Sequence, residues 1–304
     1  MYRVMTFNLL CAGRKHRKWK KRAPLVYKVI REANPDSFGV QEAHYDWMKK
    51  LAKNLPEYAF VGVGRDDGKK KGVFYKKDKF TASESGNFWL SETPDKPGKG
   101  WDAACVRVAT YVKLTDKETG KAYVHFNTHL DHVGEVARIE GVKMIQQKAA
   151  SFGGVPVVCT GDLINQGAKD YEAGIDKLFA VFQQNIIQPL LEKLNLPPER
   201  FVFCPGNHDV NRLEDSKYEE NGLFSLIDSE VAISSLMQDK RCSNSVKRMV
   251  AFKKFEKNYY SNIEGIQYQY GFFESNLILN VNGVSVGISL LNSSWRSYDS
   301  KTDK

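Results

Sequence analysis

Six polar residues that can bind a metal ion or a phosphate group lie at, or just beyond, the carboxyl ends of predicted strands. They are Asn8, Glu42, His129, Asp162, Asn207 and His208. In α/β sheets the loops after such strand ends converge on one edge, where ligands commonly bind. Oxygen ligands and imidazoles can hold a divalent cation there, which places positive charge on phosphoryl oxygens and activates water. The set therefore predicts metal-dependent hydrolysis of a phosphoester.

Asp162 is the strongest metal-ligand candidate of the six, because the segment VVCTGDL at 157–163 serves two motifs described below. The alternative is a capping Asp at a strand-to-helix turn. Asn8 has a comparable alternative, since Asn at a strand end often satisfies backbone groups. Both alternatives stay open at the level of the sequence.

Short strands and helices alternate in the first half of the chain and position four of the six residues. The predicted strands cover 3–10, 37–41, 58–63, 72–80, 104–114, 122–128 and 155–160. The predicted helices cover 23–33, 45–55 and 135–151. The loop DKETGK at 116–121 reads as a hairpin turn.

The second half has a different texture. One amphipathic helix is predicted from about 170 to 194, ending before Pro197 and Pro198. A short strand at 201–204 runs into PGNHD, and residues 214–262 read as a polar, mostly helical insertion. A hairpin at 277–292 turns at Asn282–Gly283.

The first half resembles the endonuclease/exonuclease/phosphatase superfamily of deoxyribonuclease-like metal hydrolases. The matching segments are TFN at 6–8, GVQE at 39–42, SGNFWLSETPD at 85–95, GWDAACVRVATYV at 100–112, NTHLDH at 127–132 and TGDL at 160–163. The resemblance implies that Glu42 is the main Mg²⁺ carboxylate and that Asn8 binds metal or phosphate. It also implies that His129 stabilises the transition state and that Asp162 orients the attacking water. The chain departs from this family in having Ile164 where GD-x-N has Asn, and no Ser-Asp-His signature follows Asp162.

From about residue 157 the chain resembles the calcineurin-like metallophosphoesterases instead. The matching segments are GDLINQG at 161–167, PGNHDVNR at 205–212 and NSSW at 292–295. This resemblance implies that Asp162 bridges two metals, that Asn207 is a metal ligand and that His208 contacts phosphate. The opening D-x-H pair and the closing GHxH of that family have no counterpart, and no histidine follows His208.

Together the two resemblances predict an α/β protein with a four-layer α/β/β/α sandwich, built as a hybrid of two phosphoesterase halves. The first half spans residues 1–163 and the second 157–304. The leading hypothesis is a hydrolase that uses Mg²⁺ or Mn²⁺ at Asn8, Glu42, His129 and Asp162. The second is a dinuclear Mn, Fe or Zn site on Asp162, Asn207 and His208. The third is an impaired fusion that only binds anions or nucleic acid.

Charge and composition limit the classes of partner that the protein can have. The net charge is +9, and residues 1–160 hold 29 Lys and Arg against 17 Asp and Glu, much of the excess in RKHRKWKKR at 14–22. This basic cluster could steer a phosphate-rich substrate such as nucleic acid, or could be a solvated loop. Five scattered cysteines without a CxxC pair favour reduced thiols and a cytoplasmic protein. No apolar run is long enough to cross a membrane, and the oligomeric state stays open.

Other polar groups near the motifs receive plainer interpretations. Asp131 and His132 are expected behind the site or on the surface, and His125 as an ordinary strand or surface residue. Arg107 is expected either to reach a phosphate or to pair with a carboxylate. Trp101 is expected to pack a loop.

Overall fold

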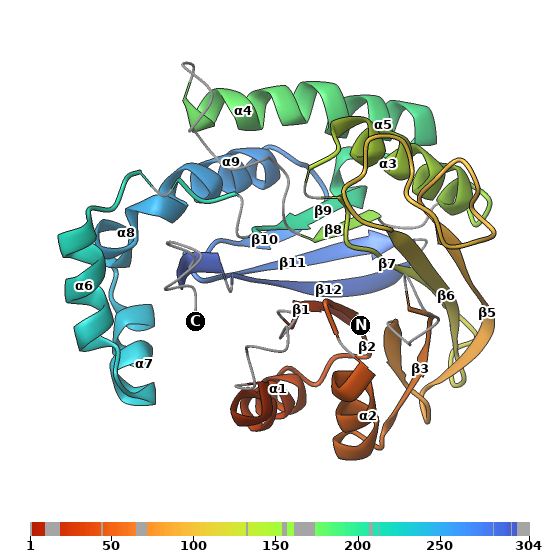
Figure 1. Ribbon diagram of the computed structural model, residues 1–304, viewed down its shortest axis with the longest axis horizontal. Coiled ribbons are helices and arrows are strands. Elements are labelled where there is room, and N and C mark those ends of the chain that lie inside the picture. The colour runs from red at the N-terminus through yellow and green to blue at the C-terminus, as the bar shows by residue number, and fades with distance from the viewer. Residues whose placement is uncertain are drawn as a thin grey trace. The chain divides into compact units, whose positions relative to one another are not determined.

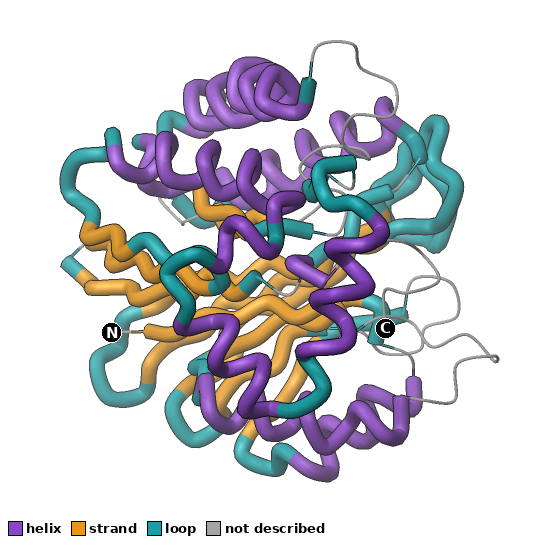
Figure 2. The backbone as a smooth tube through the Cα atoms, turned by 90° about the vertical axis from the view of Figure 1, so that its left-hand side faces the viewer, coloured by secondary structure: helices purple, strands orange, loops and turns teal. Residues whose placement is uncertain are grey.

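The structure of the chain is a computed structural model, and its description covers most of the 304 residues (Figure 1). The described ranges are 2–9, 19–43, 45–64, 72–131, 133–153, 157–160, 174–206, 209–211, 213–281, 283–292 and 294–296. The chain is of mixed α/β type (Figure 2). Two compact units divide it: Met1–Val155 with Val281–Ile288, and Pro156–Asn280 with Ser289–Lys304.

The first unit is built on a sheet in which β1 (Tyr2–Asn8) is central. It pairs in parallel with β2 (Ser37–Gln41) and with the part of β12 (Val284–Leu291) that belongs to this unit. β4 (Val73–Lys76) runs antiparallel to β2, and β3 (Tyr58–Val61) antiparallel to β4. The parallel pairing of β1 with β2 brings their carboxyl ends to the same edge of the sheet.

A second sheet of the same unit contains β5 (Phe80–Trp89), β6 (Val108–Asp116) and β7 (Ala122–Asn127), paired antiparallel in that order. The two sheets enclose an apolar core. Its fully or nearly buried members are Tyr2, Val73, Phe80, Val112 and Leu114. The Tyr2 ring lies edge-on to the Phe80 ring, with 5.4 Å between centroids, so side chains of both sheets interlock.

Helices cover the outer faces of the two sheets. Figure 1 shows α1 (Trp19–Ala33) and α2 (Tyr45–Asn54) beside β1 to β3, with α3 (Glu135–Ala150) on the side of β5 to β7. Ile30 of α1 and Leu51 of α2 are fully buried. On the other side, the Lys148 ammonium of α3 lies 4.6 Å from the Tyr111 ring centroid of β6. The four-layer α/β/β/α sandwich predicted from the sequence is confirmed in this unit.

The second unit contains the parallel pair β8 (Val157–Thr160) and β9 (Phe201–Cys204), with Thr160 opposite Cys204. It also contains α6 (Lys217–Leu226), α7 (Glu230–Gln238), α8 (Cys242–Ser245), α9 (Val250–Ser261), β10 (Gln267–Gln269) and all but the last residue of β11 (Glu274–Val281). The rings of Phe203 and Phe255 stack at 5.2 Å in its aromatic core. The helical character predicted for 214–262 is confirmed.

The helix predicted from about 170 to 194 is interrupted. The described part starts at α4 (Ile175–Phe182), widens to a π-helix at Gln183–Ile187 and continues as α5 (Gln188–Leu194). The Gln188 amide bonds to the carbonyl of Gln183, five residues earlier. Pro189 follows directly and has no N–H to donate to the carbonyl four residues before it, so the wider turn accommodates it.

One long strand was not predicted from its own residues. β5 runs over ten residues of FTASESGNFW, where the prediction ended a strand at Phe80. The middle residues, ASESGN at 82–87, have low strand propensity, and pairing with β6 along the whole length, across an irregularity between Ala82 and Glu84, makes them part of a strand.

The predicted halves, 1–163 and 157–304, overlap at β8, and the compact units divide between Val155 and Pro156. The compact units are defined by contacts in the structure, whereas the predicted halves are defined by family resemblance. The assignment of each half to a phosphoesterase family therefore stays a prediction. Among the described helices, none has both the length and the apolar character that crossing a membrane requires. Among the described residues, Cys105, Cys204 and Cys242 form no disulfide.

Candidate active site

The ends of β1 and β2 bring the first two predicted site residues together. Asn8 lies opposite Gln41 in the parallel register, and Glu42 follows Gln41 directly. The Asn8 side-chain amide donates a hydrogen bond of 3.2 Å to Glu42 Oε1. Sequence spacing placed both residues at strand ends, and the register makes those ends neighbours.

The backbone of Glu42 adopts a left-handed conformation, with φ of 53°. This region is sparsely populated by residues other than glycine, and such outliers gather at functional sites. About a quarter of the Glu42 side chain is exposed. A carboxylate held this way is accessible to a ligand.

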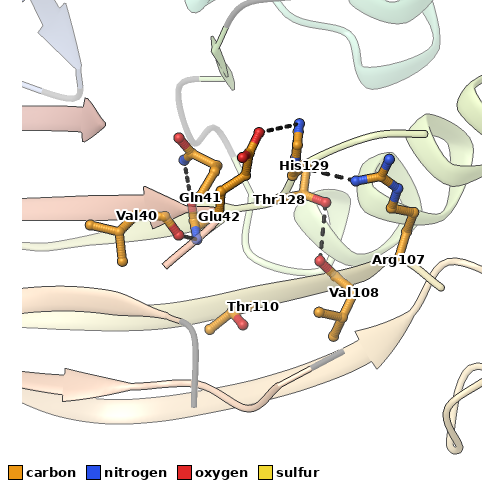
Figure 3. A pocket seen from close by; sticks show the side chains of 9 residues that line it. Val40, Gln41, Glu42, Arg107, Val108, Thr110, Thr128 and His129 are labelled. Atoms are coloured by element: carbon orange, nitrogen blue, oxygen red, sulfur yellow. Dashed lines mark hydrogen bonds and ion pairs between the residues drawn. The ribbon is translucent and has the colours of Figure 1, made fainter. Parts of the chain in front are cut away.

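His129 reaches the same place from the other sheet, two residues beyond the end of β7. Its Nε2 lies 3.9 Å from Glu42 Oε1, and its side chain is 29% exposed. Both side chains line a hollow (Figure 3). Its walls are formed by Val40, Gln41, Glu42, Arg107, Val108, Thr110, Asn127, Thr128 and His129.

A polar network under the hollow ties the two sheets together. Gln41 Nε2 donates to Asn127 Oδ1 at 2.5 Å, and Asn127 Nδ2 donates to the Val40 carbonyl at 3.1 Å. Gly39 makes this approach possible, because a Cβ there would lie 2.5 Å from Asn127 Oδ1. The glycine of GVQE and the Asn of NTHLDH are therefore one packing unit, which fixes the strands that carry Glu42 and His129.

Arg107 lies behind His129 and contacts two other side chains. Its Nη1 is 3.2 Å from His129 Nδ1, and its Nε donates to Asp131 Oδ2 at 3.1 Å. The sequence left open whether Arg107 meets a phosphate or a carboxylate. It pairs with the carboxylate of Asp131, and both residues are buried.

The carboxylate of Asp131 is anchored by main-chain amides. The donors are the N–H groups of Ala104, Cys105, Val133 and Gly134. Burial alone would raise the pKa of Asp131, but these four hydrogen bonds outweigh it and hold the pKa well below its ordinary value. Asp131 was expected behind the site or on the surface, and the structure settles this in favour of a buried group behind His129. Its place in NTHLDH, two residues after His129, was the available signal.

One arginine of the basic cluster acts near Glu42. Arg22 of α1 donates to the Leu9 carbonyl at 2.7 Å and is half-buried. Burial lowers the pKa of Arg22, and the negative charge of Glu42 partly offsets this. Positive charge therefore lies close to the hollow. Residues 10–18, with most of the basic cluster, lie outside the described residues.

Three predicted site residues, Asp162, Asn207 and His208, also lie outside the described residues. The strands before them are described, and the pairing of Thr160 with Cys204 puts the carboxyl ends of these two strands side by side. The structure thus brings Asn8, Glu42 and His129 together. The roles of the other three stay predictions.

The described donors suit a hard divalent cation held by few protein ligands. Within the described ranges, no group of three or more His, Cys, Asp or Glu side chains could hold a metal. Mg²⁺ commonly takes only one or two carboxylates and keeps several waters. The accessible Glu42 carboxylate with the Asn8 amide beside it fits that requirement, whereas a cage of imidazoles and thiolates is not formed by these residues.

Comparison with known proteins gives partial matches. No protein-family model matches the chain. An endonuclease/exonuclease/phosphatase family protein of Bacteroides thetaiotaomicron is 39% identical, covering 49% of this chain and 57% of that one, with a TM-score of 0.47. A corresponding protein of Bacteroides vulgatus is 41% identical, covering 48% and 59%, with a TM-score of 0.47. A mannosyl-6-phosphatase of Bacteroides thetaiotaomicron is 39% identical, covering 49% and 59%, with the same TM-score of 0.47.

Among curated proteins, an uncharacterized protein of Acanthamoeba polyphaga mimivirus, R895, is 24% identical over 200 residues. That match covers 54% of this chain and 29% of the mimivirus protein. The chain therefore spans under a third of this relative and somewhat more than half of each solved structure. The similar structures are endonuclease/exonuclease/phosphatase family proteins matched over about half of this chain, and the calcineurin-like resemblance stays a prediction.

Proposed function

We propose that this protein is a metal-dependent hydrolase of phosphoric esters of the endonuclease/exonuclease/phosphatase type, using Mg²⁺ or Mn²⁺. The observation that carries the proposal is the meeting of three predicted residues: Glu42 and His129 line one hollow, and Asn8 is hydrogen-bonded to Glu42. Asn8 bonds Glu42 at 3.2 Å, and Glu42 lies 3.9 Å from His129. They come from three strands of two sheets, and their convergence is what the motif resemblance requires.

In this proposal Glu42 and Asn8 hold the cation. A bound divalent metal would supply positive charge to the phosphoryl oxygens and lower the pKa of a water molecule. His129 donates its Nε2 proton to a phosphoryl oxygen and so stabilises the charge that develops during attack. Arg22, beside Glu42, adds positive charge that favours an anionic substrate. Asp162 is assigned the orientation of the attacking water, by the family resemblance alone.

The substrate class is a phosphate ester, with nucleic acid included because the first 160 residues carry the positive charge. A cytoplasmic location belongs to the same proposal. It is supported by the five scattered cysteines of the sequence, which include no CxxC pair.

The direct test is hydrolysis of bis(p-nitrophenyl) phosphate by the full chain, with and without Mg²⁺ or Mn²⁺. We expect metal-stimulated turnover that falls by about three orders of magnitude in Glu42→Gln, since the carboxylate supplies several kcal/mol through the metal. The matched control is Glu84→Gln, because Glu84 is an exposed carboxylate of the same unit paired with Lys148. Unchanged activity in Glu42→Gln would remove Glu42 from the site. Absence of metal-stimulated turnover in the unmodified chain would favour a protein that only binds anions or nucleic acid.

A second candidate is a calcineurin-like dinuclear site of Mn, Fe or Zn on Asp162, Asn207 and His208. The parallel pairing of β8 with β9 favours it, because GD and GNHD then start from adjacent strand ends. Metal analysis of the purified chain would show two ions per chain, with loss in Asn207→Ala. Retention of both ions in that variant would exclude this site.

A further inference from the structure

We propose that Arg107, braced by Asp131, is a positioning residue that fixes the orientation and the protonated ring nitrogen of His129. The inference rests on the proposed function, because it concerns how the imidazole of that site meets a substrate. It goes beyond the motif roles, which assign Arg107 and Asp131 no part in the site.

The first step is the chemistry of the contact between Arg107 and His129. A guanidinium group has only N–H donors and no acceptor. Its Nη1 lies 3.2 Å from His129 Nδ1, so Nδ1 must accept the hydrogen bond. A neutral imidazole that accepts at Nδ1 carries its proton at Nε2. The contact therefore selects one of the two tautomers.

The second step is the direction in which that proton points. Nε2 is the ring nitrogen that faces Glu42, 3.9 Å from its Oε1, across the hollow. Figure 3 shows Arg107 and Glu42 contacting different edges of the His129 ring. Arg107 thus turns an N–H donor toward the place where the phosphoryl group is proposed to lie.

The third step is what holds Arg107. Its Nε donates to Asp131 Oδ2 at 3.1 Å, and Arg107 and Asp131 are 5% and 3% exposed. The Asp131 carboxylate also accepts four main-chain N–H groups, from the loop at 104–105 and from 133–134. The guanidinium plane is therefore set by a carboxylate that cannot turn, and the order of the contacts is Asp131 to Arg107 to His129.

The consequence concerns turnover more than binding. Without Arg107 the ring can rotate and exchange tautomers, so a fraction of molecules presents an acceptor where a donor is needed. Residues that orient a reacting group through hydrogen bonds typically contribute about 10-fold to 100-fold. We expect that loss in kcat, with a smaller change in KM.

The primary test uses the unmodified full chain, labelled with ¹⁵N in its histidines. Long-range ¹H–¹⁵N correlation spectra report the tautomer of each ring, and the His129→Gln spectrum identifies the signals of His129. We expect the Nε2–H tautomer. An Nδ1–H tautomer would overturn the proposal, and the measurement needs neither turnover nor metal. An inactive chain would therefore count against the proposed function while leaving this result standing.

The variants test whether Arg107 is the cause. Arg107→Met removes the donors, and Arg107→Lys keeps the charge without the fork that contacts two partners. We expect both to give mixed tautomers at His129 and the loss in kcat. Arg138→Met is the matched control, because the Arg138 guanidinium donates to the main-chain carbonyl of Asp131, at 3.1 Å. In Arg138→Met, the His129 tautomer and kcat should equal those of the unmodified chain. If Arg107→Met does not fold, Arg107→Lys and the primary spectrum carry the test.

A double-mutant cycle separates positioning from direct contact with substrate. In the His129→Gln background, we expect Arg107→Met to lower kcat by less than about twofold, because its effect passes through His129. A loss as large as that in the unmodified background would assign Arg107 to the substrate itself and overturn the proposal.

Discussion

In the first unit the side chains of Glu42 and His129 are 25% and 29% exposed, and they face a hollow. In the second unit the side chain of Arg248 has no exposed surface, and it pairs with Asp215 and Glu220, which are 2% and 5% exposed. Charges in the first arrangement can act on a ligand, since water and solutes reach them. Those in the second can act only on their own fold, because both signs are enclosed together.

The Arg248 cluster also ties separate segments of the second unit together. Asp215 accepts the amides of Lys247 and Arg248, at 3.0 and 3.2 Å. The Asn211 amide donates to the Arg248 carbonyl at 2.9 Å. Helix α6, the 3₁₀ turn at Lys247–Met249 and the segment after PGNHD are therefore held by one buried group of charges.

The largest effect is expected for Arg248→Met, which tests whether the buried charges of the second unit stabilise its fold. Removing the cation leaves two buried carboxylates without it, so we expect a loss of about 3 to 5 kcal/mol of unfolding free energy. Urea unfolding followed by circular dichroism measures it. Lys247→Met is the matched control, because the Lys247–Glu219 pair is exposed and should leave the midpoint unchanged. Equal midpoints for the two variants would contradict the structural role of the buried cluster.

A second prediction concerns a buried histidine in the first unit. His125 is enclosed between the sheets with Ser37 Oγ 2.8 Å from its Nδ1, and burial lowers its pKa from 6.5 to about 4. Below pH 6.5 the unfolded chain takes up a proton that the folded chain does not bind until about pH 4. Stability is therefore fully present above pH 6.5 and falls as the pH is lowered through this window.

We expect the His125 contribution to fall by about 2 kcal/mol between pH 7 and pH 5. Unfolding free energies of the unmodified chain and His125→Gln at both pH values would measure it, because the variant lacks the titrating group. The same pH slope in both proteins would refute the assignment. His125 was expected as an ordinary strand or surface residue, and the structure shows the buried strand position.

The smallest predicted effect compares two glycines, one in each unit. Gly39→Ala places a Cβ against Asn127, so we expect a loss of at least about 1 kcal/mol of unfolding free energy and lower activity. Gly222 lies inside α6, and a Cβ at that position would have nothing within 4 Å of it. Gly222→Ala should gain about 0.5 to 1 kcal/mol, since alanine favours the helix. Thermal unfolding measures both changes in stability. A Gly39→Ala variant more stable than the unmodified chain would contradict the tight packing under the hollow.

Much of the first unit was predictable because its strands and helices have clear periodicity. β2 matches its predicted bounds, and α2 and α3 each end one residue early. β5 was not predictable from its own residues, since its pairing with β6 supplies what its propensity lacks. The π-helix at Gln183–Ile187 was not predictable either. Pro189 is visible in the sequence, but the wider turn that accommodates it is not.

In the site, sequence spacing found Asn8, Glu42 and His129 but left open which groups Arg107 and Asp131 contact. Asn8, Glu42 and His129 stand at strand ends, which the sequence marks. The links from His129 to Arg107 and from Arg107 to Asp131 join the residue before β6 to the segment after β7, and they depend on four loop amides. Such contacts depend on the folded path of the loop at 100–105, which has no periodic signal.

The left-handed backbone of Glu42 has a consequence for how this chain responds to selection. A non-glycine residue in that conformation costs the fold on the order of 1 kcal/mol or more. Glycine at position 42 would relieve that cost, so a library screened for heat resistance alone should enrich it. The same library screened for turnover should retain glutamate. At position 42, selection for thermal stability thus favours glycine, whereas selection for turnover favours glutamate.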